Sequence, residues 1–319
     1  MKKVVLLLVA FAFLFSSDYE SIYLKSGANA VIKEIEKNIL SDEFWTKKLQ
    51  NLDVRYGYYD SKMLLNVVAK ESKKLELFEY LNGVLTLKFT SDVLVGKKGD
   101  KLVEGDLKTP IGVYQLTRRF TPNDPYLGPL AFSLSYPNLY DKLNKRTGSG
   151  IWIHGLPLNG ERDNDVTKGC VVMENDILIQ YDKLIDYTKS LAIVYEDDIK
   201  YASKDDIGLL FAEIFRWKKA WQENDINAYL AFYDKNFKRY DGLELDKFAS
   251  SKRAIFSKNE QKTIIFSDFV ISPYPNSSIK DMFRISFYED YKALNYKFQG
   301  IKTLYVKLEN KKMKILIEE

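Results

Sequence analysis

The single cysteine of the chain, Cys170, and its single histidine, His154, are residue types that can do chemistry together. A thiol becomes a strong nucleophile when it ionises, and a neighbouring imidazole lowers its pKa by several units. The two residues are 16 positions apart, so only tertiary structure can bring them into contact. We predict that Cys170 is the nucleophile and His154 the base of a covalent catalytic mechanism.

The neighbours of this pair predict a loop that approaches a substrate carbonyl closely. Gly169 directly precedes the cysteine, and glycine allows a close approach to the backbone. We therefore expect the amides of Gly169 and Cys170 to be oxyanion donors. Because no acid lies beside His154 in the sequence, a backbone carbonyl such as that of Gly155 is expected to orient the imidazole.

Trp152, Thr167 and Lys168 flank the pair and are the candidate substrate-binding residues. Lys168 offers an ammonium group to a substrate carboxylate, with a solvated loop lysine as the equal alternative. Trp152 either lines a substrate groove or packs at the rim of a half-buried strand. The apolar alternation of residues 151–153 favours packing.

Composition excludes several other classes of site. One cysteine and one histidine cannot supply a zinc site built on several such ligands, and no phosphate-binding glycine motif is present. We expect no metal and no cofactor. The formal net charge of +4 is spread along the chain among alternating Lys and Glu residues, which argues against a nucleic-acid partner.

The N-terminus is typical of a secretory signal peptide. Lys2 and Lys3 precede an apolar run from Val4 to Phe15, which at 12 residues is shorter than the ~20 that a membrane-spanning helix needs. Residues 1–17 are therefore assigned to a signal peptide. We expect a periplasmic protein, with an uncleaved inner-membrane anchor as the alternative.

Residues 18–60 are predicted to form a helical N-terminal element. Apolar residues from Val31 to Leu52 recur at helical spacing with a break near Ser41, which predicts two short helices with Ser41 or Asp42 as a cap. Two short helices that pack only on each other cannot bury all of their apolar surface. We expect them to pack on the catalytic domain or on a second copy of the chain, as a homodimer.

Residues 61–200 show the pattern of a β-rich domain. Short apolar runs from Leu64 to Leu116, including Val93 to Val95, alternate with turn signals, and Asn82-Gly83 predicts a hairpin. A helix is predicted after the cysteine, from Ile177 to Tyr187, with Asn175 or Asp176 as its cap.

Residues 201–319 begin with helical patterns and end with strand patterns. One helix is predicted from Leu209 to Trp221, a second from Tyr229 to Tyr233, and four strands from Thr263 to Ile317. Helices followed by antiparallel strands indicate an α+β domain, and the fold class predicted for the whole chain is α+β.

The ordered motifs of the middle part resemble a known catalytic domain. His154-Gly155, then Thr167-Lys168-Gly169-Cys170, and the earlier Thr109-Pro110-Ile111-Gly112-Val113-Tyr114 are similar to the L,D-transpeptidase (YkuD-type) family over roughly Val67 to Tyr195. The C-terminal part resembles an NTF2-like domain. Together the two parts resemble the shape-determining L,D-carboxypeptidases of helical Gram-negative bacteria. This resemblance implies removal of the terminal D-alanine from tetrapeptide stems of peptidoglycan.

Two positions depart from the family pattern. Lys168 stands where many members have histidine, and Val172 stands where many transpeptidases have arginine. The second difference favours hydrolysis over cross-linking. An L,D-transpeptidase that uses the same cysteine and histidine is one alternative, and a non-catalytic wall-binding scaffold is the other. Peptidoglycan stem peptides are the expected partner.

Overall fold

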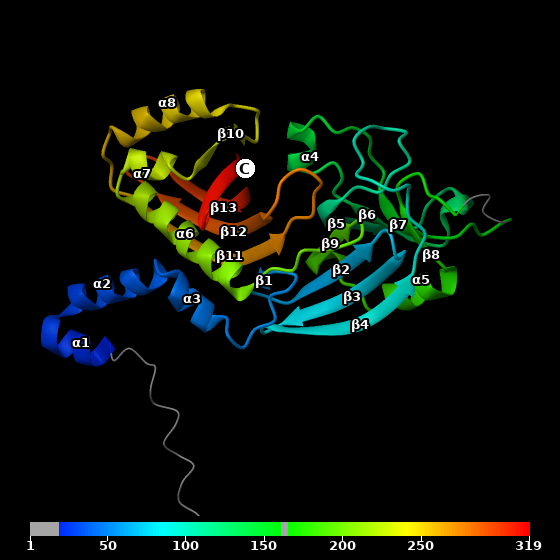
Figure 1. The fold of residues 1–319 in the computed structure, drawn as a ribbon, viewed down its shortest axis with the longest axis horizontal. Coiled ribbons are helices and arrows are strands. Elements are labelled where there is room, and N and C mark those ends of the chain that lie inside the picture. Colours follow the sequence, from blue (N-terminus) through cyan, green and yellow to red (C-terminus); the bar gives the residue numbers. More distant parts are fainter. Residues whose placement is uncertain (1–18, 161–164) are drawn as a thin grey trace, which may run out of the picture.

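The structure, a computed structural model, describes residues 19–160 and 165–319 and has two lobes, each built on its own sheet (Figure 1). The signal peptide predicted for residues 1–17 lies outside the described residues. Within the described ranges, no helix combines the length and the apolar character needed to cross a membrane.

Three helices precede the first lobe, the two predicted on either side of Ser41 and one more before them. They are α1 Tyr19–Ser26, α2 Ala28–Ile39 and α3 Asp42–Lys48. Ser41, one of the two predicted caps, accepts a hydrogen bond from the Phe44 amide at the start of α3. This bond satisfies one of the amides that a helix N-terminus leaves without a partner.

The helix α3 packs on the C-terminal lobe, so the expected packing on the catalytic domain is wrong. Trp45 stacks on Phe211 and Phe215 of the helix α6 (Lys204–Gln222), with ring centroids 4.6 and 5.5 Å apart. Neither α1 nor α2 contains a buried residue, and the apolar side chains of Ile32 and Ile35 are exposed. The first two helices therefore keep an apolar face that residues 19–160 and 165–319 do not cover.

The middle of the chain forms an eight-stranded mixed sheet in the order β4-β3-β2-β9-β5-β6-β7-β8. The strands are β2 Met63–Ala69, β3 Lys74–Leu81, β4 Val84–Asp92, β5 Gly112–Phe120, β6 Ala131–Leu134, β7 Trp152–Gly155, β8 Val171–Met173 and β9 Ser190–Tyr195. The predicted hairpin joins β3 to β4, with Asn82 and Gly83 both at positive φ, as a tight hairpin turn requires. The run from Val93 to Val95 forms no strand, only an isolated bridge from Leu94 to Val172.

Two short helices and two 3-10 turns complete this lobe. They are η1 Pro125–Leu127, α4 Leu139–Leu143, α5 Asn175–Asp182 and η2 Tyr187–Lys189. The helix α5 is shorter than predicted, and its N-cap position is Glu174, which makes no side-chain cap bond, so neither predicted cap is used. The buried face of α5 places the Tyr181 hydroxyl 2.7 Å from Asn66 Oδ1 in the core.

The C-terminal lobe is a six-stranded sheet in the order β1-β11-β12-β13-β14-β10, packed against α6. Its other elements are β1 Tyr58–Tyr59, α7 Ile226–Leu230, β10 Tyr233–Arg239, α8 Leu245–Phe256, β11 Thr263–Pro273, β12 Met282–Lys292, β13 Lys297–Glu309 and β14 Lys312–Glu318. All four predicted strands are present. The second predicted helix ends at Leu230 because Tyr233 already begins β10, and α8 was not predicted.

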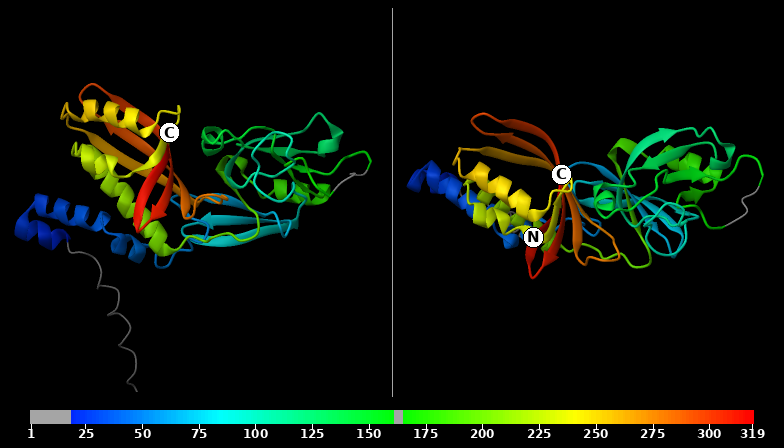
Figure 2. Two further views of the ribbon diagram at one scale, coloured as in Figure 1. Left: turned by 45° about the horizontal axis from the view of Figure 1, so that its top comes forward. Right: turned by 90° about the horizontal axis from the view of Figure 1, so that it is seen from above.

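The lobes lie side by side (Figure 2). A cluster of buried side chains forms an interface between them. Tyr140 of α4 packs against Tyr274, which follows β11, with the rings tilted and their centroids 5.2 Å apart, and it stacks on Tyr305 of β13 at 5.9 Å. The ring of Tyr59 of β1 meets that of Tyr80 of β3 edge-on, with centroids 5.0 Å apart. Since one cluster of buried side chains crosses the boundary, packing joins the lobes in addition to the connecting chain.

Candidate active site

The parallel pairing of β7 with β8 sets the positions of His154 and Cys170. In this register Ile153 lies opposite Val171, and His154 lies opposite Val172. Paired residues of neighbouring strands point to the same face of a sheet, and successive residues of one strand alternate between faces. Because Cys170 comes two residues before Val172, the register puts it on the face of His154, one strand away.

The imidazole of His154 is 2% exposed and is oriented by the backbone. Its Nδ1 atom lies 2.8 Å from the Gly155 carbonyl oxygen, the orienting contact expected for Gly155. A carbonyl oxygen only accepts, so Nδ1 carries the proton in this contact and Nε2 of the neutral ring is the basic nitrogen. A Cβ at position 155 would lie 2.1 Å from Asn175 Oδ1 and 3.0 Å from Pro129 Cδ, so a side chain there would have to displace its neighbours.

The partly exposed Cys170 thiol donates a hydrogen bond to the Gly150 carbonyl, with Sγ and O 3.4 Å apart. This carbonyl was not predicted as part of the site. A hydrogen bond from the thiol stabilises the protonated form relative to the thiolate. The contact therefore orients the resting thiol, and a base must remove its proton before attack.

Thr167 fixes the turn that precedes the cysteine. Its hydroxyl accepts from the Gly169 amide at 3.0 Å and donates to the Cys170 carbonyl at 2.6 Å. Thr167 is 1% exposed, so the structure gives it a role in shaping this turn in place of the predicted substrate contact. The amide of Gly169 has one proton and donates it to Thr167. In this arrangement Gly169 is therefore not an oxyanion donor, which leaves the Cys170 amide as the candidate.

A charged loop of residues 96–110 lies against the same turn, and the sequence analysis did not connect it with the site. A Cβ at Gly169, where φ is +123°, would lie 2.8 Å from the Lys108 carbonyl oxygen. Asp106 organises the loop by accepting from the amides of Leu102 and Lys108 at 2.8 and 3.1 Å and from Lys101 Nζ at 2.9 Å. Burial opposes ionisation of Asp106, but these donors lower its pKa to about 2. The only local signal was the mixture of glycine and charged residues between two strands.

The other two candidates lie at the edge of the site. Trp152 is half-buried and meets Phe120 edge-on, with ring centroids 4.9 Å apart, which favours the packing role over the substrate role. Lys168 is exposed on the turn between Thr167 and Gly169. The protein does not bury its ammonium group, and the predicted contact of Lys168 with a substrate carboxylate stays a prediction.

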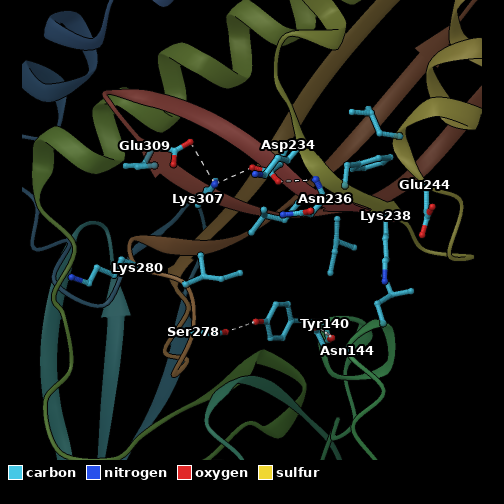
Figure 3. A pocket seen from close by; sticks show the side chains of 18 of the residues that line it. Tyr140, Asn144, Asp234, Asn236, Lys238, Glu244, Ser278, Lys280, Lys307 and Glu309 are labelled. Atoms are coloured by element: carbon cyan, nitrogen blue, oxygen red, sulfur yellow. Dashed lines mark hydrogen bonds and ion pairs between the residues drawn. The ribbon is translucent and has the colours of Figure 1, made fainter.

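An open groove of about 860 Å³ lies between the lobes, away from the candidate site residues (Figure 3). The catalytic lobe lines it with Tyr140 and Asn144 of α4, and the C-terminal lobe contributes charged groups that include Asp234, Lys307 and Glu244. Asp234 and Lys307 form an ion pair at 2.9 Å. None of the predicted site residues lines this groove, so the candidate pair Cys170 and His154 lies on a different surface.

Two protein-family profiles match the chain. The L,D-transpeptidase catalytic domain (YkuD) matches residues 65–193, and the Cds6 C-terminal NTF2-like domain matches residues 209–319. The first range contains every predicted site residue. A search of curated proteins found no match to the chain.

Solved structures extend the likeness to both lobes. A crystal structure of the helical cell shape determining protein Pgp2 from Campylobacter jejuni is 44% identical, covers 88% of this chain and 99% of that chain, and superposes with a TM-score of 0.85. A second Pgp2 structure, also 44% identical, covers 88% of this chain and all of that chain, with a TM-score of 0.84. Bd1075 of Bdellovibrio bacteriovorus is 29% identical, covers 82% of this chain and 92% of that chain, and has a TM-score of 0.65.

Proposed function

The chain belongs to the family of the helical cell shape determining protein Pgp2, with an L,D-transpeptidase (YkuD) catalytic domain followed by an NTF2-like domain, and on that premise we propose that it is a cysteine-dependent peptidoglycan L,D-carboxypeptidase. Its substrate is the tetrapeptide stem, and its products are the tripeptide stem and free D-alanine.

The observation that carries this proposal is the relation of His154 to Cys170. The β7–β8 register puts both side chains on one face, and the Gly155 carbonyl holds Nδ1 so that Nε2 is the basic nitrogen. A thiol beside an oriented imidazole is the arrangement that nucleophilic acyl transfer needs. No metal ligand or cofactor enters this reaction.

In the first half of the reaction, His154 Nε2 takes the proton of the Cys170 thiol. The thiolate then attacks the carbonyl of the diaminopimelate residue that precedes the terminal D-alanine, forming a C–S bond and an oxyanion that the Cys170 amide stabilises. When the C–N bond breaks, the imidazolium returns its proton to the leaving amine. D-Alanine departs and a thioester remains on the enzyme.

In the second half, water replaces the departed amine. His154 Nε2 takes a proton from water, the hydroxide attacks the thioester carbonyl, and the C–S bond breaks. The thiolate leaves and recovers the proton from the imidazolium. The tripeptide stem departs with a new carboxylate, and the enzyme returns to its starting state.

Val172 supports hydrolysis over transfer to a second stem. It lies opposite His154, on the face of the nucleophile, and is fully buried. An apolar side chain there gives no charged group for an incoming acceptor stem. An amine acceptor would convert the same thioester into a cross-link, so the acceptor step decides between the two activities.

The location that fits this substrate is the periplasm, reached through the N-terminal signal. The helices α1 and α2 are the proposed contact between two copies of the chain. This part of the proposal rests on the exposed apolar side chains of Ile32 and Ile35.

The test is to incubate the purified protein with disaccharide tetrapeptide, with and without a tripeptide acceptor, and to weigh the products. Tripeptide and free D-alanine are expected from the wild type and neither from Cys170→Ala. A cross-linked dimer would identify a transpeptidase. Equal activity in Cys170→Ala would remove the cysteine from the mechanism, and tight wall binding without any product would identify a scaffold.

A further inference from the structure

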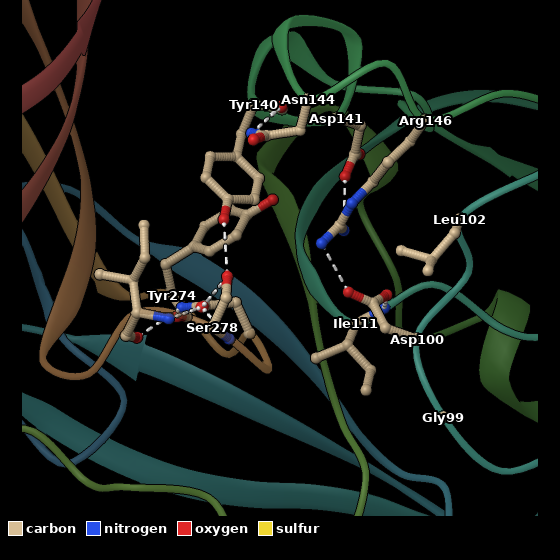
Figure 4. A network of polar contacts seen from close by, with 12 residues as sticks. Gly99, Asp100, Leu102, Ile111, Tyr140, Asp141, Asn144, Arg146, Tyr274 and Ser278 are labelled. Atoms are coloured by element: carbon tan, nitrogen blue, oxygen red, sulfur yellow. Dashed lines mark hydrogen bonds and ion pairs between the residues drawn. The ribbon is translucent and has the colours of Figure 1, made fainter. Parts of the chain in front are cut away.

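Arg146 is buried between two carboxylates in the catalytic lobe, and the proposed reaction gives it no role (Figure 4). Its Nη2 lies 2.7 Å from Asp100 Oδ2, and its Nη1 lies 2.9 Å from Asp141 Oδ1. The side chain of Arg146 is 6% exposed, that of Asp100 is 3% exposed, and that of Asp141 is fully buried. Transferring charged groups from water into a protein interior costs free energy, so a buried ion cluster is a candidate for a functional role.

The Asp100 side of the cluster closes the loop of residues 96–110. Asp100 Oδ1 accepts from the Ile111 amide at 2.8 Å, which ties the beginning of the loop to its end. The Gly96 amide donates to Thr109 Oγ1 at 2.8 Å, which makes a second closure. This is the loop whose Lys108 carbonyl oxygen faces Gly169, directly before the nucleophile.

The Asp141 side fixes α4. Asp141 Oδ2 accepts from the Asn138 amide at 3.0 Å, and Asn138 Oδ1 accepts from the Asp141 amide at 3.0 Å, a reciprocal cap. The Arg146 amide also donates to the Asp141 carbonyl at 2.9 Å. Both ends of the arginine, backbone and side chain, are thus tied to one aspartate.

Arg146 begins the segment that leads to the active site. Four residues later, the Gly150 carbonyl accepts from the Cys170 thiol, and two residues after that β7 begins. Between them, the Thr147 amide donates to the Leu102 carbonyl at 3.1 Å, and the Glu104 amide donates to Thr147 Oγ1 at 3.0 Å. The two loops that meet Cys170 therefore run together, and Arg146 is the charged group that links them.

We propose that Arg146 is a positioning residue: by bridging Asp100 and Asp141 it holds the Gly150 carbonyl and the 96–110 loop on the two sides of Cys170. Without the guanidinium, two buried carboxylates face each other and the loops separate. The thiol then loses its carbonyl acceptor. Only a planar fork reaches both carboxylates at once, so lysine replaces arginine incompletely.

A second arginine pair in the same lobe provides a matched control. Arg119 Nε and Nη2 lie 2.5 and 2.6 Å from the two oxygens of Asp182, but the arginine side chain is 45% exposed. Among the described residues, neither of the two forms a hydrogen bond or an ion pair with the two loops. Loss of this pair removes an arginine–aspartate contact without moving the surroundings of Cys170.

The test uses the fact that the chain has one thiol, so iodoacetamide reports on Cys170 alone. The alkylation rate is measured against pH for the full-length wild type, Arg146→Gln, Arg146→Lys and Arg119→Gln. Because the hydrogen bond to Gly150 favours the protonated thiol, its loss should move the alkylation midpoint of Arg146→Gln to lower pH. The midpoint of Arg146→Lys should lie between those of the wild type and Arg146→Gln, and the midpoint of Arg119→Gln should equal that of the wild type. An unchanged or raised midpoint in folded Arg146→Gln overturns the proposal.

If Arg146→Gln does not fold, the triple variant Asp100→Asn, Arg146→Gln, Asp141→Asn tests the positioning role instead, because it removes all three charges of the cluster together. It should fold and still show the lowered midpoint, and wild-type alkylation in the folded triple variant would refute the positioning role. The inference about turnover rests on the proposed function: D-alanine release should fall about 100-fold in kcat/KM. Alkylation needs no substrate, so absence of D-alanine release from the wild type would reject the proposed function while leaving this test valid.

Discussion

The side-chain amide of Asn138 donates a hydrogen bond to the hydroxyl of Tyr274, with the two atoms 2.9 Å apart. Asn138 caps α4 in the catalytic lobe, and Tyr274 follows β11 in the C-terminal lobe. The same hydroxyl lies beside Gly112, where an added Cβ would be 2.8 Å from it. The glycine of the Thr109–Tyr114 motif thus makes room for a side chain of the other lobe.

Gly112→Ala should destabilise the protein by about 1–3 kcal/mol, because φ is +151° and the new methyl group meets the Tyr274 and Tyr114 hydroxyls. Chemical unfolding measures the loss. Tyr274→Phe removes the nearest atom, so the double variant should lose less stability than the sum of the two single variants. Strict additivity would show that the lobes do not meet at Gly112.

Gly169→Ala should slow alkylation of Cys170 and D-alanine release, because the new Cβ would lie 2.8 Å from a backbone oxygen and displace the turn. Gly242→Ala is the control. It also has positive φ, +84°, but an added Cβ there meets nothing within 4 Å. Both rates should be unchanged in the control, and equal behaviour of the two variants would contradict a tight fit behind the nucleophile.

The stability contributed by Asp141 should fall as the pH rises from about 4 to about 6. Burial raises the pKa of Asp141 from 3.8 to about 6, although Arg146 and the Asn138 amide lower it and Asp100 adds to the increase. Since the folded state holds this proton more tightly than the unfolded state, deprotonation across that window favours unfolding.

The free energy of unfolding measured from pH 4 to 7.5 checks this slope. Asp141→Asn should remove the decrease between pH 4 and 6, while Asp182→Asn, at the exposed pair with Arg119, should keep it. Parallel curves for the wild type and Asp141→Asn would mean that Asp141 titrates at its ordinary pKa.

Lys168→Gln should raise KM for the tetrapeptide about fivefold with kcat little changed, if its exposed ammonium pairs with a substrate carboxylate. Steady-state kinetics of D-alanine release separate the two constants. Lys183→Gln, an exposed lysine after α5, controls for the loss of a surface charge. A fall in kcat without a change in KM would place Lys168 in the chemical step instead.

The homodimer remains a prediction, and α2 is where it can be tested. Replacing the exposed Ile32 and Ile35 by serine should convert a dimer into a monomer in sedimentation experiments, because their apolar surface would no longer drive association. Exposed Ile265 and Ile301 of the C-terminal lobe provide the control pair. A wild type that sediments as a monomer at all concentrations would reject this contact.

The sequence by itself determined the features that depend on neighbours along the chain. Asn82 and Gly83 predicted their hairpin because few residues adopt positive φ, and the apolar spacing from Leu209 to Trp221 marked α6. Cys170 and His154 became the candidate pair because no other residue of either type is present. Periodicity failed at Tyr233, whose helical spacing from Tyr229 was overridden by long-range pairing of β10 with β14.

Only the tertiary structure decided what surrounds Cys170. The Gly150 carbonyl that accepts from the thiol, the Lys108 carbonyl behind Gly169, and the hydroxyl of Thr167 that takes the Gly169 amide come from separate segments. Two of these groups are backbone carbonyls, which nearly every residue carries. Residue types in the sequence therefore cannot predict which carbonyls lie at the site. Their roles follow from the folding of segments distant in sequence, here linked by a buried arginine, and that geometry exists only once the sheet has paired.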